Sequence, residues 1–131
     1  MLFRSVHRVA RILKALKPYS ADQLEHLHRQ NELFVIYKDH QPVAAAHIQR
    51  KTANRLEIVT LATDSNHRQR GHAQALLRNL ERYAARHSLS IEFQVRADNA
   101  PAIRLYEQAG YTADERRSVS WLYTRWSKSS I

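Results

Sequence analysis

Hydrophobic residues near the start of the chain recur at the spacing of a single helix face. The residues that carry this spacing are Val6, Val9, Leu13 and Leu16. Arginines fall on another face, and Pro18 stops the pattern because proline breaks a helix interior. The pattern predicts an amphipathic helix, preceded by a short strand at Leu2 to Arg4.

A second helix and a strand hairpin are expected next. Ser20, with Gln23 three residues later, is typical of a capped helix start. Residues 33–37 (LFVIY) and 43–48 (VAAAHI) are strand-like runs, and the K-D-H-Q-P between them indicates a hairpin turn. This part of the chain is therefore predicted to form two helices followed by two paired strands.

The segment 55–63 (RLEIVTLAT) changes the phase of its alternation partway along. Leu56 and Ile58 share one parity, whereas Val59 and Leu61 share the other. A β-bulge produces such a slip, and bulges are enriched beside active sites. A strand that is buried on both faces explains the pattern equally well, so both interpretations stay open.

A long helix is expected to begin at Gly71. Its apolar stripe consists of Ala73, Leu76, Leu77, Leu80 and Ala84. Apolar and polar residues then alternate over 91–95, which predicts a strand.

A short helix and a last strand complete the pattern. Asn99 is expected to cap a helix that has Pro101 in its first turn and ends at Gly110. The residues that predict the last strand are Val119, Trp121 and Tyr123. Helices, a hairpin and then alternating strands and helices indicate an α/β or α+β fold.

Composition favours one ordered domain without cysteine chemistry. A length of 131 residues with 44% hydrophobic and 25% charged residues suits a single domain spanning 1–131. The absence of cysteine excludes disulfides, thiol nucleophiles and cysteine-ligated zinc, and it fits a reducing, cytoplasmic location. No apolar run approaches the roughly 18 residues of a membrane helix, so no membrane partner is expected.

The net charge of +9 indicates an anionic partner without choosing one. Such a balance attracts nucleic acid, an anionic membrane or a phosphate-rich small molecule. The first 21 residues hold five Lys or Arg and no Asp or Glu. An arginine-rich, acid-free start is typical of a mitochondrial transit peptide, and the alternative is a helix whose basic face is solvated.

The scarcity of glycine and the spacing of histidine exclude several common sites. Two glycines cannot form the G-x-G-x-x-G dinucleotide fingerprint, and Gly71 and Gly110 lie too far apart for a P-loop. No G-x-S-x-G nucleophile elbow and no H-E-x-x-H zinc motif occurs. His26 and His28 point to different helix faces, so no metal site is expected.

Gly71 stands between basic residues at the expected start of the long helix. A helix N-terminus presents unpaired N–H groups and a partial positive charge, which favour an anion. Because it has no Cβ, Gly71 lets a phosphate approach the backbone, and Arg68 and Arg70 add charge and directed donors. The loop is therefore a candidate diphosphate site, with a solvated basic loop as the alternative.

Two motifs in this half of the chain resemble those of the GCN5-related N-acetyltransferase (GNAT) superfamily. Residues 68–73 (RQRGHA) match the family's R/Q-x-x-G-x-G/A motif, directly after a strand as the family requires. Residues 99–111 (NAPAIRLYEQAGY) resemble the second signature, N-x-x-A-x-x-L-Y-x-x-x-G-F, with Tyr in place of the final Phe. Both glycines fall at motif positions, and the chain from about Glu32 resembles the family's central hairpin.

The resemblance implies a single GNAT-fold domain with a central mixed, mostly antiparallel sheet flanked by about four helices, in the order β-α-α-β-β-β-α-β-α-β-β. It also implies acetyl-CoA as the acetyl donor. In this family the strand before the loop offers backbone groups to the pantetheine arm, and the loop holds the pyrophosphate. The implied cofactor-binding residues are Leu61, Ala62, Thr63, Arg68, Gln69, Arg70, Gly71, His72, Ala73, Asn99 and Tyr106.

The resemblance further implies direct attack of a primary amine on the acetyl thioester, with Tyr106 near the sulfur as general acid. A phenol with an ordinary pKa of about 10 can donate a proton without being ionised at neutral pH. The alternative role of Tyr106 is core packing beside Leu105. Glu57 is the only carboxylate on the preceding strand, and many relatives carry an acid where this chain has Val59 and Thr60. Glu57 therefore either acts as the base through a water chain or merely faces solvent.

Functions from three classes fit these observations. The first is an acetyl-CoA-dependent N-acetyltransferase, the second a CoA-binding regulator without turnover, and the third a basic nucleic-acid or ribosome-associated module. A mixed case is an acetyltransferase whose acceptor amine is carried on RNA or the ribosome. The sequence identifies neither the acceptor nor the choice between monomer and homodimer. Core packing is the expected role of the aromatic residues Trp121, Tyr123 and Trp126.

Overall fold

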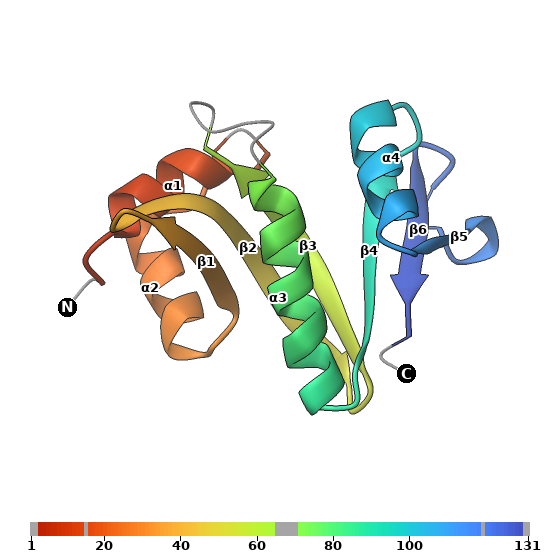
Figure 1. Ribbon diagram of the computed structural model, residues 1–131, viewed down its shortest axis with the longest axis horizontal. Helices are drawn as coiled ribbons and strands as arrows, with labels where there is room; N and C mark the ends of the chain where they lie inside the picture. Colours follow the sequence, from red (N-terminus) through yellow and green to blue (C-terminus); the bar gives the residue numbers. More distant parts are fainter. Residues whose placement is uncertain (1–2, 15, 65–70, 119, 130–131) are drawn as a thin grey trace. The chain divides into compact units, whose positions relative to one another are not determined.

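The computed structural model describes residues 3–14, 16–64, 71–118 and 120–129. Within these residues the regular elements are α1 (Val6–Leu13), α2 (Ala21–Arg29), β1 (Leu33–Lys38), β2 (Gln41–Thr52), β3 (Arg55–Thr63), α3 (His72–Arg86), β4 (Ser90–Arg96), α4 (Ala100–Gln108), β5 (Thr112–Asp114), the 3-10 turn η2 (Glu115–Arg117) and β6 (Tyr123–Lys128) (Figure 1).

Hydrogen bonds join the strands in the order β1-β2-β3-β4-β6-β5. β3 pairs with β4 in parallel, whereas β1 with β2, β4 with β6 and β5 with β6 pair antiparallel. The predicted mixed, mostly antiparallel sheet with flanking helices is thus confirmed. The chain divides into two compact units, the first made of residues 1–49 and 58–80 and the second of residues 50–57 and 81–131.

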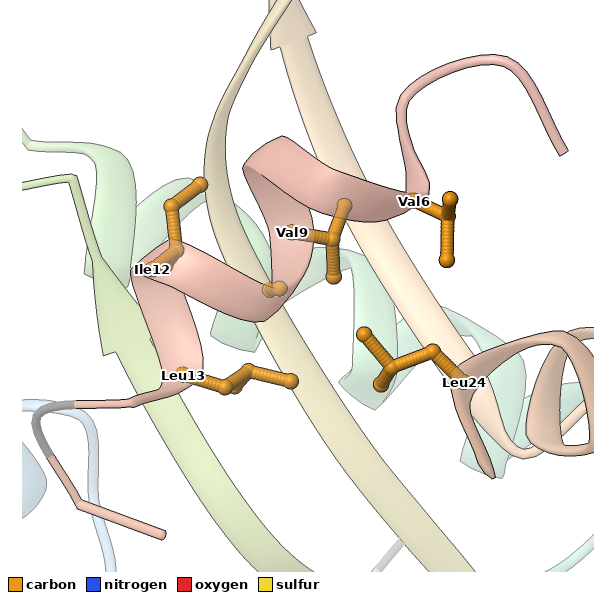
Figure 2. Close-up of a cluster of buried hydrophobic side chains, with 6 residues drawn as sticks. Val6, Val9, Ile12, Leu13 and Leu24 are labelled. Atoms are coloured by element: carbon orange, nitrogen blue, oxygen red, sulfur yellow. The ribbon is translucent and has the colours of Figure 1, made fainter. Parts of the chain in front are cut away.

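The core of the first unit includes the apolar faces of α1 and α2. Val6, Val9, Ile12 and Leu13 of α1 are buried, and so is Leu24 of α2. Figure 2 shows Leu13 on α1 and Leu24 on α2 pointing toward one another, whereas Ile12 points to the other side of α1. The amphipathic helix predicted near the start of the chain therefore forms, and its apolar stripe faces the core.

The capping box of α2 is confirmed, and α1 is shorter than the sequence predicts. Ser20 Oγ accepts a hydrogen bond from Gln23 N–H at 3.1 Å, and Gln23 Oε1 accepts one from Ser20 N–H at 2.7 Å. α1 ends at Leu13, so Leu16, which the spacing assigns to the apolar face, is exposed. Ile12 is buried instead, because residues three apart share a helix face and Ile12 follows Val9.

The predicted strand at Leu2 to Arg4 is wrong for the residues that the structure describes. Phe3 lies outside any strand, and Arg4 lies in a turn before α1. The Phe3 N–H donates to Oε2 of the buried Glu25 at 2.6 Å. This tertiary hydrogen bond takes the backbone donor that a strand partner would need.

β1 and β2 form the predicted hairpin, with one irregularity in their pairing. Asp39 and His40 have positive φ values of 52° and 64°, as the central residues of a type I′ turn require. The register shifts between Ile36 and Tyr37, at the point where Tyr37 lies opposite Pro42. Proline has no N–H to donate to the ladder, which accounts for an interruption at this position.

The core of the second unit lies between α4 and the strands β4 and β6. Ile91, Phe93 and Val95 are buried, as the alternation in this strand predicts. The Phe93 ring lies 4.0 Å from the ring of Tyr106 on α4, measured between centroids. On β6, the buried Trp126 pairs with Phe93 across the sheet.

The last strand begins later than the sequence predicts. β6 runs over Tyr123–Lys128, whereas Trp121 lies in a turn and is 87% exposed. Val119 lies outside the described residues. Core packing is therefore confirmed for Trp126 and wrong for Trp121, because the pairing of β6 with β4 decides which aromatic residue faces inward.

Candidate active site

The start of α3, in the first unit, has a backbone that a phosphate group can approach. Gly71 has a φ of +78°, and a Cβ added to it would meet no atom of the described residues within 4 Å. Its carbonyl accepts the first helical hydrogen bond, from Ala75 N–H at 3.0 Å. The amides before Ala75 consequently have no acceptor within the helix, and no acidic residue lies in the first turn. Open space and outward-directed N–H groups are what an anion at a helix start requires.

The structure describes the predicted loop from Gly71 onward. Arg68, Gln69 and Arg70 lie outside the described residues. His72 and Ala73 form the first turn of α3 and are half-buried. The predicted pantetheine-binding segment, Leu61 to Thr63, is the half-buried end of β3 and belongs to the same unit.

The change of phase in β3 comes from a buried polar residue. Leu56, Ile58 and Thr60 are buried, whereas Val59 is 37% exposed. The inward parity thus continues unbroken to Thr60, and this burial pattern requires no bulge up to that residue. The interpretation of a strand buried on both faces is wrong, because Val59 reaches solvent.

Thr60 is accommodated by a hydrogen-bonded cluster with Tyr19 and His47. The Tyr19 hydroxyl lies 2.7 Å from His47 Nδ1 and 2.9 Å from Thr60 Oγ1. The cluster joins the segment before α2, the strand β2 and the strand β3 immediately before residues 61–63. Burial raises the pKa of Tyr19, and its hydrogen bond with Thr60 partly opposes that rise. Sequence reasoning missed this cluster, and its one signal was the polar Thr60 between apolar neighbours.

In the second unit, Asn99 caps α4 as predicted. Its Oδ1 accepts a hydrogen bond from Ala102 N–H at 3.3 Å, and Pro101 lies in the first turn. The cap uses the side-chain oxygen, so the side-chain NH₂ group is a donor that the cap does not require. Asn99 is exposed, which makes it accessible to a ligand.

Tyr106 is a buried member of an aromatic cluster. It is 8% exposed, and its ring centroid lies 4.0 Å from that of Phe93 and 5.9 Å from that of Tyr111. Burial raises the pKa of Tyr106 to about 12, because ionising the hydroxyl in this surrounding is unfavourable. Tyr106 therefore packs in the core and also keeps a protonated hydroxyl throughout the neutral pH range.

Glu57 belongs to a charged cluster in the second unit. Its carboxylate lies 3.2 Å from Lys51 Nζ and 3.8 Å from Arg125 Nη1, and its side chain is 17% exposed. The neighbouring Glu92 is buried and pairs with Arg117 and Arg125, each at 2.9 Å. Cations compensate both carboxylates, so Glu57 does not merely face solvent.

Neither a metal centre nor a membrane span is found in the described part of the chain. Within residues 3–14, 16–64, 71–118 and 120–129, no three His, Asp or Glu side chains are grouped so as to hold a metal ion. Over the same ranges, no helix has the length and apolar character needed to cross a membrane.

The fold is similar to those of solved acetyltransferase structures. The structure of yncA from Salmonella typhimurium with its cofactor acetyl-CoA has a TM-score of 0.80 at 14% identity, over 100% of this chain and 92% of that one. Arabidopsis thaliana Naa50 with the bisubstrate analogue CoA-Ac-MVNAL gives 0.73 at 16% identity, over 98% and 96%. The ribosomal-protein-S18-alanine N-acetyltransferase from Escherichia coli gives 0.70 at 19% identity, over 97% and 88%. No curated protein sequence matches the chain.

The sequence also matches the model of the acetyltransferase (GNAT) family over residues 5–111. This range contains both predicted motifs, and it begins before Glu32, where the resemblance noted in the sequence starts. It also covers the elements from α1 to α4. The chain therefore belongs to the acetyltransferase (GNAT) family and is an acetyl-CoA-dependent N-acetyltransferase.

Proposed function

We propose that this N-acetyltransferase acetylates the α-amino group at a protein N-terminus and holds the diphosphate of acetyl-CoA at residues 68–73. The observation that carries the cofactor site is Gly71, whose positive φ and open surroundings leave the backbone accessible at the start of α3. Helix N-termini favour negative charge and direct N–H groups toward it. The backbone of residues 61–63, in the same unit, is proposed to bind the pantetheine arm, with Asn99 as a further contact.

The acceptor class is supported by the names of two structural relatives. One is named for an alanine of ribosomal protein S18, and the other was solved with the analogue CoA-Ac-MVNAL. The net charge of +9 supports an acceptor that is carried on an anionic particle such as the ribosome, because long-range attraction speeds encounter. A cytoplasmic location belongs to this proposal, and the absence of cysteine agrees with it.

Tyr106 is proposed to assist the departing sulfur. Attack of the amine forms the C–N bond and breaks the C–S bond, and the sulfur leaves with the electron pair. The pKa of Tyr106 is about 12 and an ordinary thiol has a pKa of about 8.5, so complete proton transfer from this phenol to the thiolate is uphill. A hydrogen bond from the hydroxyl to the developing negative charge is favourable without such transfer. We therefore assign Tyr106 the stabilisation of the leaving group.

Glu57 is the candidate base, and its ion pairs argue for a mainly structural role. An alkylammonium must lose a proton before it attacks. Lys51 and Arg125 already occupy the vicinity of the Glu57 carboxylate, so a water chain has to compete with them for its oxygens. Glu57→Gln separates the two roles. A base predicts a large loss of turnover at unchanged free energy of unfolding, whereas a structural role predicts a lower free energy of unfolding with turnover retained in the folded fraction.

Calorimetry and thiol release test the proposal as a whole. We expect heat on titration with CoA, and release of CoA thiol from acetyl-CoA when a peptide with a free N-terminal alanine is added. The same peptide with an acetylated N-terminus is the control and is expected to release none. Polyamines, an aminoglycoside and aminoacyl-tRNA complete the panel.

The remaining outcomes of this experiment distinguish the alternatives. Thiol release with aminoacyl-tRNA alone would replace the protein N-terminus as the acceptor. CoA binding without release by any amine would support the CoA-binding regulator. An absence of heat with CoA would contradict the cofactor site itself.

A further inference from the structure

The first unit contains a groove whose lining residues, among those that the structure describes, are not part of the proposed cofactor site. It has a volume of about 730 Å³ and lies between the start of α1, the end of α2 and the β1–β2 turn. The polar and aromatic side chains that matter here are Arg4, His7, Arg8, His28, Tyr37 and His40. The proposed cofactor contacts, residues 61–63 and 71–73, are not among the residues that line it.

The charge of the groove favours an anion. Among the described residues that line it, two are arginines, three are histidines and none is acidic. The first turn of α1, which forms one wall, likewise has no acidic residue. Two carboxylates lie near the groove without lining it. Glu25 on α2 is buried and accepts the Phe3 N–H at 2.6 Å, and Asp39 lies in the β1–β2 turn beside His40. Arg4 and Arg8 are both exposed, so each guanidinium group is available for bidentate hydrogen bonding to a phosphate.

The groove also presents aromatic rings in fixed positions. Phe3 and His28 are stacked, with centroids 4.7 Å apart and planes 22° from parallel. Tyr37 is 52% exposed, and its hydroxyl lies 2.6 Å from Ser5 Oγ, which holds the ring at the groove. The register of the β1–β2 pair shifts between Ile36 and Tyr37, and Tyr37 lies opposite Pro42, which also lines the groove. Exposed, oriented rings are the surfaces on which proteins stack nucleic-acid bases.

The volume of the groove restricts the class of ligand further. A volume of about 730 Å³ is within the range of small-molecule sites and is far larger than inorganic phosphate requires. The guanidinium groups of Arg4 and Arg8 favour a ligand that carries an anionic group. We propose that this groove binds a nucleoside monophosphate unit, with the phosphate on Arg4 and Arg8 and the base against Tyr37. The unit is either a free mononucleotide or one nucleotide of an RNA strand.

Calorimetry and amide NMR on the full chain test the proposal with AMP as the probe. AMP is expected to bind and to shift the amide signals of residues around the groove. Inorganic phosphate represents the phosphate group of AMP, and adenosine represents its nucleoside. Each is expected to bind at least about tenfold more weakly than AMP.

Three variants localise the binding. Arg4→Gln and Arg8→Gln are each expected to weaken AMP binding about tenfold, and Tyr37→Leu is expected to weaken AMP binding without affecting phosphate. Arg78→Gln is the matched control, since Arg78 is an exposed arginine on α3 outside the groove and its loss should change nothing. The mutated side chains are all exposed, and thermal unfolding confirms that each variant is folded.

The affinities of a short RNA and of AMP identify the source of the nucleotide, and other results would contradict the proposal. A tetra-adenylate that binds at least about tenfold tighter than AMP, with steep salt dependence, identifies RNA as the source. Equal affinities identify a free mononucleotide. The proposal is overturned if AMP does not bind, or if the arginine variants bind it as the wild type does. None of these results depends on acetyl transfer.

Discussion

The two glycines of the chain share a backbone conformation and differ in what surrounds them. Gly71 precedes α3 with a φ of +78°, and Gly110 follows α4 with a φ of +90°. A Cβ at Gly71 would meet no atom of the described part of the chain within 4 Å, whereas one at Gly110 would lie 3.6 Å from Cε and Nζ of Lys128. Lys128 Nζ also donates to the carbonyl of Ala109 at 2.7 Å and so closes the end of α4.

This difference shows that one residue type serves two purposes here. At Gly110 the positive φ lets the chain leave the helix, and the lysine packs over the turn. At Gly71 no described protein atom fills the space beside the backbone, so that space is available to a ligand. Positions open to solvent are thus expected to affect ligand binding, and positions closed by packing are expected to affect stability.

Tyr106→Phe is expected to have the largest effect of the variants that test this distinction. Tyr106 is buried in the core and is nevertheless proposed to act on the leaving sulfur. We expect turnover to fall roughly 10²- to 10⁴-fold. CoA affinity should change by less than about threefold, since the ring is retained. Thiol release at saturating acetyl-CoA and calorimetry measure the two quantities. Tyr111→Phe, in the same aromatic cluster, is the control and should keep turnover. Undiminished turnover in Tyr106→Phe would remove the hydroxyl from the mechanism.

Burial of the same hydroxyl predicts a loss of stability at alkaline pH. The pKa of Tyr106 is about 12 in the folded protein, against about 10 for tyrosine in an unfolded chain. Between these values the unfolded chain binds fewer protons, so the free energy of unfolding falls as the pH rises, by up to about 3 kcal/mol from this group. This contribution is complete below pH 10 and lost above pH 12. Urea denaturation across this range should give a shallower decline for Tyr106→Phe than for the wild type, and parallel declines would contradict the prediction.

Alanine at each glycine tests the comparison directly. Both substitutions place a side chain at positive φ, at a similar cost of about 1 kcal/mol in the free energy of unfolding. Gly71→Ala alone puts a methyl group in the proposed path of the diphosphate. We expect CoA to bind at least about tenfold more weakly to Gly71→Ala and to keep its affinity for Gly110→Ala. Equal CoA affinity of the two variants, measured by calorimetry, would mean that the open space is not the diphosphate site.

Asn99 allows a finer test, because its oxygen caps α4 while its NH₂ group is proposed to reach the cofactor. Asn99→Ala is expected to lower the free energy of unfolding by about 1 kcal/mol, whereas Asn99→Asp keeps an oxygen cap and should remain near wild-type stability. Both substitutions remove the amide donor, so both should weaken CoA binding by a few-fold. If Asn99→Asp binds CoA as the wild type does, the role of Asn99 is confined to the cap.

Much of the fold could be predicted from short-range patterns. The apolar stripe of α3, the capping box of α2 and the cap at Asn99 each depend on residues within one or two helical turns of each other. The hairpin followed from a turn between two apolar runs, and the family from two motifs that each contain one glycine. The predicted strand at Leu2 to Arg4 is wrong at Phe3 and Arg4. Two further errors lie at element ends, where Leu16 and Trp121 have the right residue type and are exposed.

The sequence by itself determined most of the elements, the acetyltransferase family and the place of Gly71 at the start of α3. Tertiary structure alone decided that Thr60 faces inward against Tyr19 and His47, and that cations surround Glu57. It also decided that Arg4, Arg8 and Tyr37 share one groove. The physical reason is that periodicity and capping act between close neighbours in the chain, whereas the partner of a buried polar or charged group is set by which distant segments pack together.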